Sequence, residues 1–246
     1  MKKRNKNDII KQKVVIDVRT FIISDLHGHE VEFKTILKTI NFQPDDKMYI
    51  LGDVIDRGEK PIDLLEYILS QPNMILLKGN HEQMMYESYR GNKFNREPIK
   101  EMWLYNGGEI TLAQFEKLSE DKKEELLDKI RELPYYEKIE VNNKKYFLSH
   151  AGILLQKDTP FNWNLRRQIE NQDILWNRDE LLHNENYSEF IMIHGHTPTI
   201  YWDSWNASQI YYYDNDKKIN IDCGCAGEYK MGCICLDTGR EYYVKC

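Results

Sequence analysis

The sequence predicts an α/β protein with a layered fold, in which helices sandwich mixed β-sheets, in a single domain spanning residues 1–246. Two observations predict this class. Short apolar runs alternate with helix-like segments up to Leu77, and the last third of the chain is rich in short strands. No Pro/Gly/Ser-rich linker or internal repeat divides the chain, and its length allows one well-buried core.

The first half of the chain is predicted to alternate strands with helices. Strands are expected at three apolar runs, Phe21–Ser24, Met48–Leu51 and Met74–Leu77. Helices are expected between them, at Val31–Ile40 and at Pro61–Leu69, where Pro is acceptable near the first turn. Residues 81–133 are predicted to be mainly helical, with a break at Asn106-Gly107-Gly108.

The second half is predicted to be richer in strands. Tyr135–Val141 and Tyr146–Ser149 flank Asn142-Asn143, a pattern typical of a β-hairpin. A short helical segment is expected near Asn164–Ile169. The remaining strands are expected at Phe190–Ile193, Ile210–Tyr213, Ile219–Cys223, Gly232–Leu236 and Tyr242–Lys245.

Charge and hydropathy exclude several classes of protein. No apolar run approaches the roughly 18–20 residues that a membrane-spanning helix needs. Residues 1–20 carry seven Lys/Arg and two Asp/Glu, whereas the rest carries 27 basic and 38 acidic residues, a net charge of −11. Because a body this acidic repels a phosphate backbone, we expect no nucleic-acid partner and no membrane partner. The basic N-terminus lacks the apolar region of a secretory signal, so we expect a cytoplasmic location.

Five cysteines lie late in the chain, four of them in a C-x-C-x7-C-x-C pattern. Structural zinc sites usually have two to four residues between paired cysteines, so this spacing argues against one. Cysteines two positions apart share one face of a strand. An odd number of cysteines without a signal peptide predicts reduced, buried thiols at Cys223, Cys225, Cys233, Cys235 and Cys246.

Polar side chains follow five of the apolar runs, at the point where each predicted strand ends. These side chains are Asp, Asn or His. Because five runs end in this way, we expect their side chains to converge on one pocket. In α/β sheets, ligands bind at the carboxyl ends of the strands. The candidate ligands are Asp25, His27, Asp53, Asn80, His150 and His196.

This set combines carboxylate, amide and imidazole donors without a thiolate, which suits manganese, iron or zinc. Six donors are too many for one tetrahedral zinc ion but fit two ions that share a bridging carboxylate. Two metal ions about 3.5–4 Å apart are suited to phosphoryl chemistry. Two further histidines, His29 and His194, each lie two residues from a candidate ligand, and we expect them to contact the ligands or lie on the surface nearby without binding metal directly.

At these residues the chain resembles the metal-dependent serine/threonine phosphoprotein phosphatases, within the calcineurin-like metallophosphoesterase superfamily. The matching blocks occur in the family's order: Asp25-Leu26-His27-Gly28, the Gly52–Gly58 block with its Asp-Arg-Gly, Gly79-Asn80-His81-Glu82, Ser149-His150-Ala151 and Gly195-His196-Thr197-Pro198. The motifs GNHEQMM, LYNGG and Leu175-Trp176-Asn177-Arg178 resemble the bacteriophage lambda phosphatase branch. The resemblance implies a metallophosphoesterase-type layered fold.

The resemblance also implies a role for each position. Asp25 and His27 would hold the first metal, Asp53 would bridge both, and Asn80, His150 and His196 would hold the second. Two divalent ions, with manganese expected and iron or zinc possible, would supply a bridging hydroxide that attacks phosphorus directly. Arg57 and Arg178 would bind the phosphoryl oxygens. His81, oriented and kept cationic by Asp56, would protonate the leaving oxygen.

The implied substrate is a phosphorylated protein or peptide, and no obligatory regulatory subunit is expected. The main alternative is a dinucleoside polyphosphate hydrolase of the same fold. Symmetrical hydrolases of that type resemble the chain broadly, but typically lack the Asp of the Asp-Arg-Gly block and carry Asp after Asn-His. Asp56 and Glu82 therefore favour the phosphoprotein branch. A metal-dependent nuclease and a non-catalytic phosphopeptide-binding module are weaker alternatives.

Overall fold

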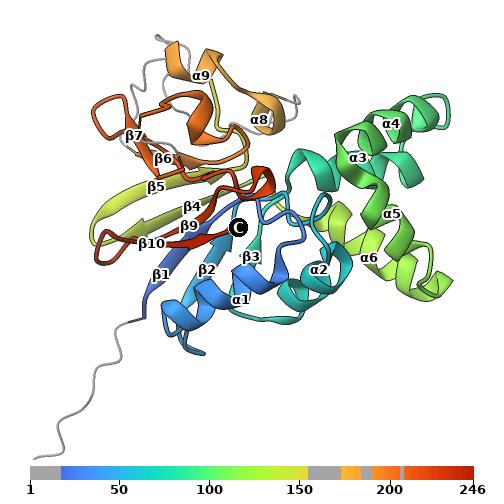
Figure 1. The fold of residues 1–246 in the computed structure, drawn as a ribbon, viewed down its shortest axis with the longest axis horizontal. Helices are drawn as coiled ribbons and strands as arrows, with labels where there is room; N and C mark the ends of the chain where they lie inside the picture. The colour runs from blue at the N-terminus through green and yellow to red at the C-terminus, as the bar shows by residue number, and fades with distance from the viewer. Residues whose placement is uncertain (1–17, 155–172, 184–189, 206–207) are drawn as a thin grey trace, which may run out of the picture.

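The computed structural model describes residues 18–154, 173–183, 190–205 and 208–246, and its core is a pair of five-stranded sheets (Figure 1). The first sheet has the order β10-β9-β1-β2-β3. Strands β1, β2 and β3 are parallel, β9 is antiparallel to β1, and the edge strand β10 is antiparallel to β9. The bounds are β1 Thr20–Ile23, β2 Lys47–Ile50, β3 Met74–Leu76, β9 Lys230–Cys235 and β10 Arg240–Lys245.

The second sheet has the order β4-β5-β6-β8-β7. Its three central strands, β5, β6 and β8, are parallel, and the edge strands β4 and β7 are antiparallel to their neighbours. The bounds are β4 Tyr136–Val141, β5 Lys144–Ser149, β6 Ile191–His194, β7 Tyr211–Tyr213 and β8 Lys218–Asn220. Both sheets are mixed, which confirms the predicted fold class.

Helices cover the outer faces of the sheet pair (Figure 1). Helices α1 and α2 lie on the first sheet, and α3 to α6 form a helical group beside it, whereas α8 and α9 lie on the second sheet. The bounds are α1 Glu30–Thr39, α2 Pro61–Ser70, α3 Asn80–Arg90, α4 Arg96–Trp103, α5 Glu109–Phe115, α6 Glu120–Glu132, α8 Asp173–Trp176 and α9 Glu180–His183. Short helical turns occur at η1 Leu104–Gly108, η2 Thr199–Tyr201 and η3 Cys225–Gly227.

The core lies in layers because strand β1 alternates its side chains between two faces. Phe21 and Ile23 pack toward the helices, while Ile22 packs toward the second sheet, and all three are fully buried. Strands with two buried faces have continuous apolar sequences, as the parallel strands here do. Burial on both faces therefore fixes the positions of the strands whose carboxyl ends precede the candidate ligands, which are β1, β2, β3, β5 and β6.

Most predicted elements occur within one or two residues of the expected bounds. The predicted hairpin is confirmed: Asn142 and Asn143 both have left-handed backbone angles (φ of 51° and 60°), which a two-residue hairpin turn requires. The predicted helical break is the π-helical turn η1, where Gly107 has a φ of 100°. The strand expected at Ile219–Cys223 ends early, at Asn220, whose side chain accepts a hydrogen bond from the backbone N–H of Asp222.

The helix expected near Asn164–Ile169 lies outside the described residues, and the short helices α8 and α9 were not predicted. The prediction that Cys223 and Cys225 share one face of a strand is wrong, because Gly224 turns the chain with a φ of 80°. No helix in the described part of the chain is long and apolar enough to cross a membrane.

The prediction that all five cysteines are reduced is also wrong for one pair. Cys225 and Cys246 form a disulfide in the structure, because the end of β10 returns beside η3. The other three, Cys223, Cys233 and Cys235, are free and buried, as expected of small apolar side chains.

Candidate active site and metal centre

Five loops at the carboxyl ends of the parallel strands meet at one edge of the two sheets. The first sheet contributes the segments after β1, β2 and β3, and the second contributes those after β5 and β6. Backbone hydrogen bonds join the loops: the N–H of His27 donates to the carbonyl of Asp53 (2.9 Å), and that of Gly195 donates to the carbonyl of His150 (2.7 Å). The structure thus brings together residues from 25 to 196.

The backbone of this edge is unusually strained. Non-glycine residues with left-handed backbone angles cost about 1–2 kcal/mol each and are uncommon. Several are site residues: Asp25 (φ 53°), His27 (42°), Asp53 (53°), Asp56 (73°), Arg57 (65°) and His196 (71°). Such strain persists only where the surrounding structure enforces it, and it concentrates at functional sites.

Two groups of metal-binding side chains share the carboxylate of Asp53. His27, Asp53 and His81 form one group, and Asp53, His150 and His196 form the other; the candidate ligand atoms of each group lie within 4.8 Å of one another. Oδ2 of Asp53 lies 3.6 Å from Nε2 of His27, while Oδ1 lies 3.5 Å from Nε2 of His150. The two oxygens therefore face different groups, as a bridging carboxylate requires.

The hydrogen bonds of the histidines orient them as metal ligands. Nδ1 of His27 donates to the carbonyl of Ile55 (3.0 Å), and Nδ1 of His150 donates to the carbonyl of Leu51 (2.7 Å). Each bond fixes the tautomer and leaves the Nε2 lone pair directed into the site.

Acceptor atoms then crowd together around His150. Its Nε2 atom lies 2.8 Å from Oδ1 of Asn80 and 3.1 Å from Nδ1 of His196, and Nε2 of His196 is buried without a partner. Converging lone pairs and an unpaired buried nitrogen are unfavourable unless a cation binds between them. The donor set therefore fits a divalent metal ion.

Burial sets the protonation of these groups. It lowers the pKa of His27, His150 and His196, so all three are neutral at physiological pH, the form that binds metal. Burial, together with the neighbouring carboxylate of Asp25, raises the pKa of Asp53 well above its ordinary range. Divalent cations would offset this repulsion and keep the carboxylate ionised.

Asp25 is placed somewhat differently from the expectation. Its Oδ2 atom accepts hydrogen bonds from the backbone N–H of His196 (3.0 Å) and from the hydroxyl of Ser24, and it is in neither group of three. The carboxylate nonetheless lies close enough to Asp53 to raise the pKa of that residue. Asp25 thus joins the His196 loop of the second sheet to the first sheet.

A buried acid–imidazole pair lies beside the first group. Nδ1 of His81 lies 2.5 Å from Oδ2 of Asp56, and the indole N–H of Trp103 donates to the same oxygen (2.8 Å). Arg57 reaches over this pair, with one guanidinium nitrogen 3.0 Å from Nε2 of His27 and another 3.1 Å from Nε2 of His81. Its exposed side chain is thus held at the mouth of the site.

The second predicted arginine lies near the other group of candidate ligands. Arg178 is exposed, and its guanidinium donates to the hydroxyl of Thr197 (3.4 Å), one residue after His196. Its positive charge contributes to the lowered pKa of both His150 and His196. Arg57 and Arg178 therefore approach the metal-binding groups from the first and the second sheet, respectively.

Two buried carboxylates hold the loops of the site in place, a role that the sequence did not predict. Glu82 is fully buried, and its carboxylate accepts hydrogen bonds from four backbone N–H groups, including those of Asp53 (2.9 Å) and Gly79 (3.0 Å). A second buried acid, Asp222, lies near Asp25 and accepts from the N–H of Gly224 (2.9 Å). Only Glu82 has a sequence signal, its place in the Asn-His-Glu motif.

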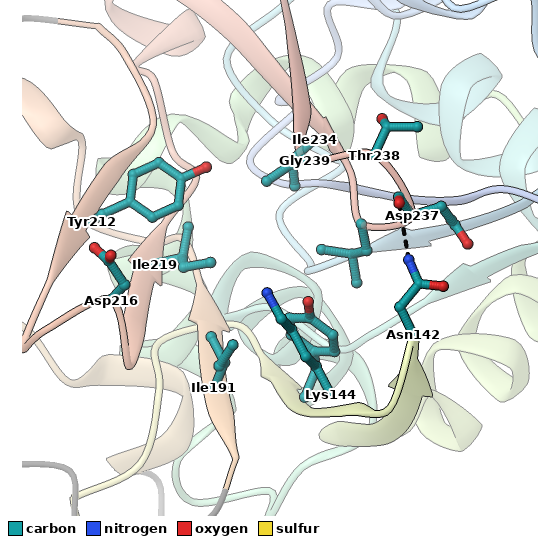
Figure 2. A pocket seen from close by; sticks show the side chains of 12 residues that line it. Asn142, Lys144, Ile191, Tyr212, Asp216, Ile219, Ile234, Asp237, Thr238 and Gly239 are labelled. Atoms are coloured by element: carbon teal, nitrogen blue, oxygen red, sulfur yellow. Dashed lines mark hydrogen bonds between the residues drawn. The ribbon is translucent and has the colours of Figure 1, made fainter.

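A separate cavity of about 390 Å³ opens between the sheets at their other edge (Figure 2). Apolar side chains such as Ile191, Ile219 and Ile234 line it, and Asn142 donates to the carbonyl of Asp237 at its rim (2.9 Å). None of the predicted site residues is among its lining residues. The ligand loops and this cavity are therefore separate features.

Comparison with known protein families and sequences finds one matching family and relatives with two different names. A family model described as calcineurin-like phosphoesterase matches residues 18–225. Serine/threonine-protein phosphatase 2 of Salmonella typhimurium is 32% identical over 165 residues, covering 66% of this chain and 69% of that protein. A symmetrical bis(5'-nucleosyl)-tetraphosphatase of Erwinia tasmaniensis is 28% identical over 153 residues, covering 61% of this chain and 50% of that protein.

Solved structures share the fold at low sequence identity. A structure assigned as a diadenosine tetraphosphatase matches with a TM-score of 0.62 and 12% identity, covering 94% of this chain and 95% of that one. A serine/threonine phosphatase from Saccharomyces cerevisiae matches with a TM-score of 0.57 and 18% identity, covering 95% and 82%. At these identities the likeness concerns the fold alone.

Proposed function

The chain belongs to the calcineurin-like phosphoesterase family and is a phosphoester hydrolase of that type, and we propose that it is a serine/threonine protein phosphatase. The proposed substrate is a phosphomonoester on a protein or peptide, with phosphotyrosine as a further possible target. Among the relatives, the phosphatase of Salmonella typhimurium supports this choice by its name and its identity of 32%.

The family uses a dinuclear metal site, and the donors described above fit one. We propose manganese for both positions. Bound there, two divalent cations supply hydroxide at neutral pH and neutralise charge on the phosphoryl group. The residues that would hold them are Asp25, His27, Asp53, Asn80, His150 and His196.

The other side chains bind the substrate and move the proton. Arg57 lies beside His27 and Arg178 beside Thr197, and a planar guanidinium can bind phosphoryl oxygens in bidentate fashion. Nε2 of His81 faces the same space and would donate a proton to the leaving oxygen. Asp56 holds the other ring nitrogen and so stabilises the imidazolium.

The single observation that carries the choice of substrate is the buried Asp56–His81 pair. A serine or threonine alkoxide is a poor leaving group and requires protonation as the ester bond breaks. A nucleotide phosphate leaving from a phosphoanhydride is far less basic and gains less from a general acid. A fixed acid with its own buried carboxylate is therefore best matched to alkyl phosphomonoesters.

A parallel assay of one preparation tests this proposal. The full chain, loaded with manganese, is assayed on phosphoserine, phosphothreonine and phosphotyrosine peptides and on diadenosine tetraphosphate. We expect higher kcat/KM on the phosphoserine and phosphothreonine peptides. The variant Asp53→Asn, assayed in the same way, measures any contaminating phosphatase.

The second candidate is hydrolysis of dinucleoside polyphosphates, which the relatives named symmetrical bis(5'-nucleosyl)-tetraphosphatase support at 28–29% identity. A higher kcat/KM on diadenosine tetraphosphate than on every phosphopeptide would establish this function instead.

A further inference from the structure

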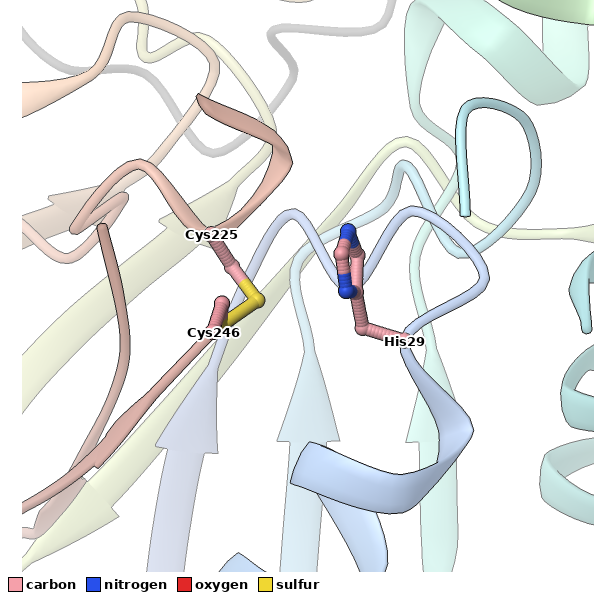
Figure 3. Close-up of side chains that lie close together, drawn as sticks. All are labelled: His29, Cys225 and Cys246. Carbon is pink, nitrogen blue, oxygen red and sulfur yellow. A yellow bond between two sulfur atoms is a disulfide. The ribbon is translucent and has the colours of Figure 1, made fainter. Parts of the chain in front are cut away.

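Three metal-binding side chains lie together outside the active site (Figure 3). They are His29 in the loop before α1, Cys225 at the start of η3 and Cys246 after β10, and their donor atoms all lie within 4.8 Å of one another. The two sulfur atoms form the disulfide, with the Cα atoms 5.3 Å apart. Segments distant in the sequence therefore bring two sulfurs and one imidazole to one point.

The remaining thiols differ in their surroundings. Cys223, Cys233 and Cys235 are free and no more than 3% exposed, and burial raises the pKa of Cys223 and Cys233. Buried thiols of this kind are unreactive. Of the pair beside His29, Cys225 is also only 2% exposed, but Cys246 is partly buried and the side chain of His29 is 24% exposed.

We propose that Cys225, Cys246 and His29 form a binding site for one soft divalent cation, zinc in particular, when the disulfide is reduced. Two thiolate sulfurs and one imidazole nitrogen are donors that zinc prefers, with a fourth position left for water. This donor set contains sulfur, whereas the active site offers only oxygen and nitrogen. The presence of sulfur donors therefore distinguishes this site from the active site.

A dithiol can reduce the disulfide between Cys225 and Cys246. The dithiol gives two electrons and two protons, which break the S–S bond and form two S–H groups, and it becomes a disulfide itself. The cation then displaces the two thiol protons and forms two metal–sulfur bonds. Because the disulfide and the metal use the same sulfur atoms, each state excludes the other.

The surroundings of His29 support a ligand role. Oε2 of Glu32 lies 3.7 Å from Nδ1 of His29, where a small movement would let it accept a hydrogen bond and orient the ring, as carboxylates do for metal-binding histidines. The backbone N–H of His29 donates to the carbonyl of Leu26 (2.9 Å), which fixes the loop. A bound cation would tie this loop, which also contains His27, to η3 and to the residue that follows β10.

The test is a titration of the reduced full chain with cobalt(II), after a dithiol reductant has been removed without oxygen. Thiolate-bound cobalt has a charge-transfer absorbance in the near ultraviolet that oxygen and nitrogen donors do not produce. We expect one equivalent of thiolate-bound cobalt, displaced by zinc, and none in the oxidised chain. This readout does not depend on phosphatase activity or on metal in the active site.

Variants connect the signal to the proposed residues. Cys225→Ser and Cys246→Ser should each abolish the absorbance, while Cys235→Ala should retain it as the matched control. His29→Gln should weaken cobalt binding by about tenfold or more. No absorbance in the reduced chain, or an undiminished absorbance in Cys246→Ser, overturns the proposal; because Cys246 is only partly buried, this variant remains informative if Cys225→Ser does not fold.

Discussion

The carboxylate of Asp56 and the imidazole of His81 form a 2.5 Å hydrogen bond that is almost completely shielded from solvent. The indole of Trp103 donates to the same carboxylate oxygen, so the position of Asp56 is fixed from two sides. The bond holds the ring of His81 with Nε2 directed toward Arg57. In the structure Nε2 accepts from the Arg57 guanidinium; in the proposed reaction that guanidinium binds phosphate and Nε2 donates a proton.

Replacing His81 should separate proton transfer from metal binding. We expect His81→Asn to lower kcat on an alkyl phosphomonoester by about 100- to 10,000-fold, the usual contribution of a general acid. On an aryl phosphate with an acidic leaving group the loss should be smaller, and metal content should stay unchanged. Equal losses on both substrates would show that His81 is not the acid.

The position of the candidate site was predictable from the sequence because each candidate ligand closely follows an apolar strand. Parallel strands end at one edge, so the order of strands and motifs was enough to bring His27, Asp53 and His150 together. The support beneath the site was not predictable in this way. The Asn-His-Glu motif marks Glu82, but the partners of its carboxylate are backbone N–H groups, which leave no pattern in the sequence.

The disulfide was also not predictable from the sequence. Cys225 and Cys246 are 21 residues apart and belong to different elements, and their contact depends on where β10 ends in space. The spacing of cysteines within strands indicates a shared face only while the strand continues. Gly224 ends that regularity, and no alternation of residues reveals the left-handed turn that follows.

Glu82 should prove essential for the loop that carries Asp53. In Glu82→Gln, the amide nitrogen would face backbone N–H groups that need an acceptor, and each unsatisfied donor costs roughly 1–3 kcal/mol. We expect the free energy of unfolding to fall by about 3 kcal/mol and metal affinity to weaken. Denaturant titration and metal analysis measure both, with exposed Glu101→Gln as the control. Unchanged stability would contradict this role.

Removing the metals should abolish activity and lower stability together. Chelation leaves the unpaired Nε2 of His196 and the crowded acceptors around His150 without a cation. We expect no turnover after dialysis against a chelator, recovery with manganese, and a rise in Tm on metal addition. In Asp53→Asn the same addition should raise Tm much less. A chelated chain with full activity would refute a metal-dependent reaction.

Acid should weaken the link between Arg19 and Asp46 at the start of the first sheet. Burial raises the pKa of Asp46, but hydrogen bonds from Arg19 and from the N–H of Gln43 outweigh it and hold the pKa below its ordinary value of 3.8. A folded-state pKa below that of the unfolded chain gives stability at higher pH that disappears as pH falls through it.

We therefore expect Asp46→Asn to lower the free energy of unfolding by about 1–3 kcal/mol at neutral pH. The difference from the native chain should shrink as pH falls below about 4. Asp45→Asn, at the exposed neighbouring position, is the control and should change little. A difference that stays constant down to strongly acidic pH would exclude the charged pair as its cause.

Arg178 provides the last prediction, because it is the proposed phosphate ligand that the second sheet contributes. The described contact of its guanidinium is a long hydrogen bond of 3.4 Å to Thr197, so the side chain is available to bind an anion. We expect Arg178→Ala to raise KM by about tenfold, to lower kcat and to weaken inhibition by inorganic phosphate, with metal content unchanged. Lysine carries the same charge but cannot form the two parallel hydrogen bonds of a guanidinium, so Arg178→Lys should recover part of the loss. Arg131→Ala, whose side chain is 53% exposed on α6, is the control for the loss of one surface charge. Normal kinetics and normal phosphate inhibition in Arg178→Ala would leave Arg57 as the only guanidinium proposed for the substrate.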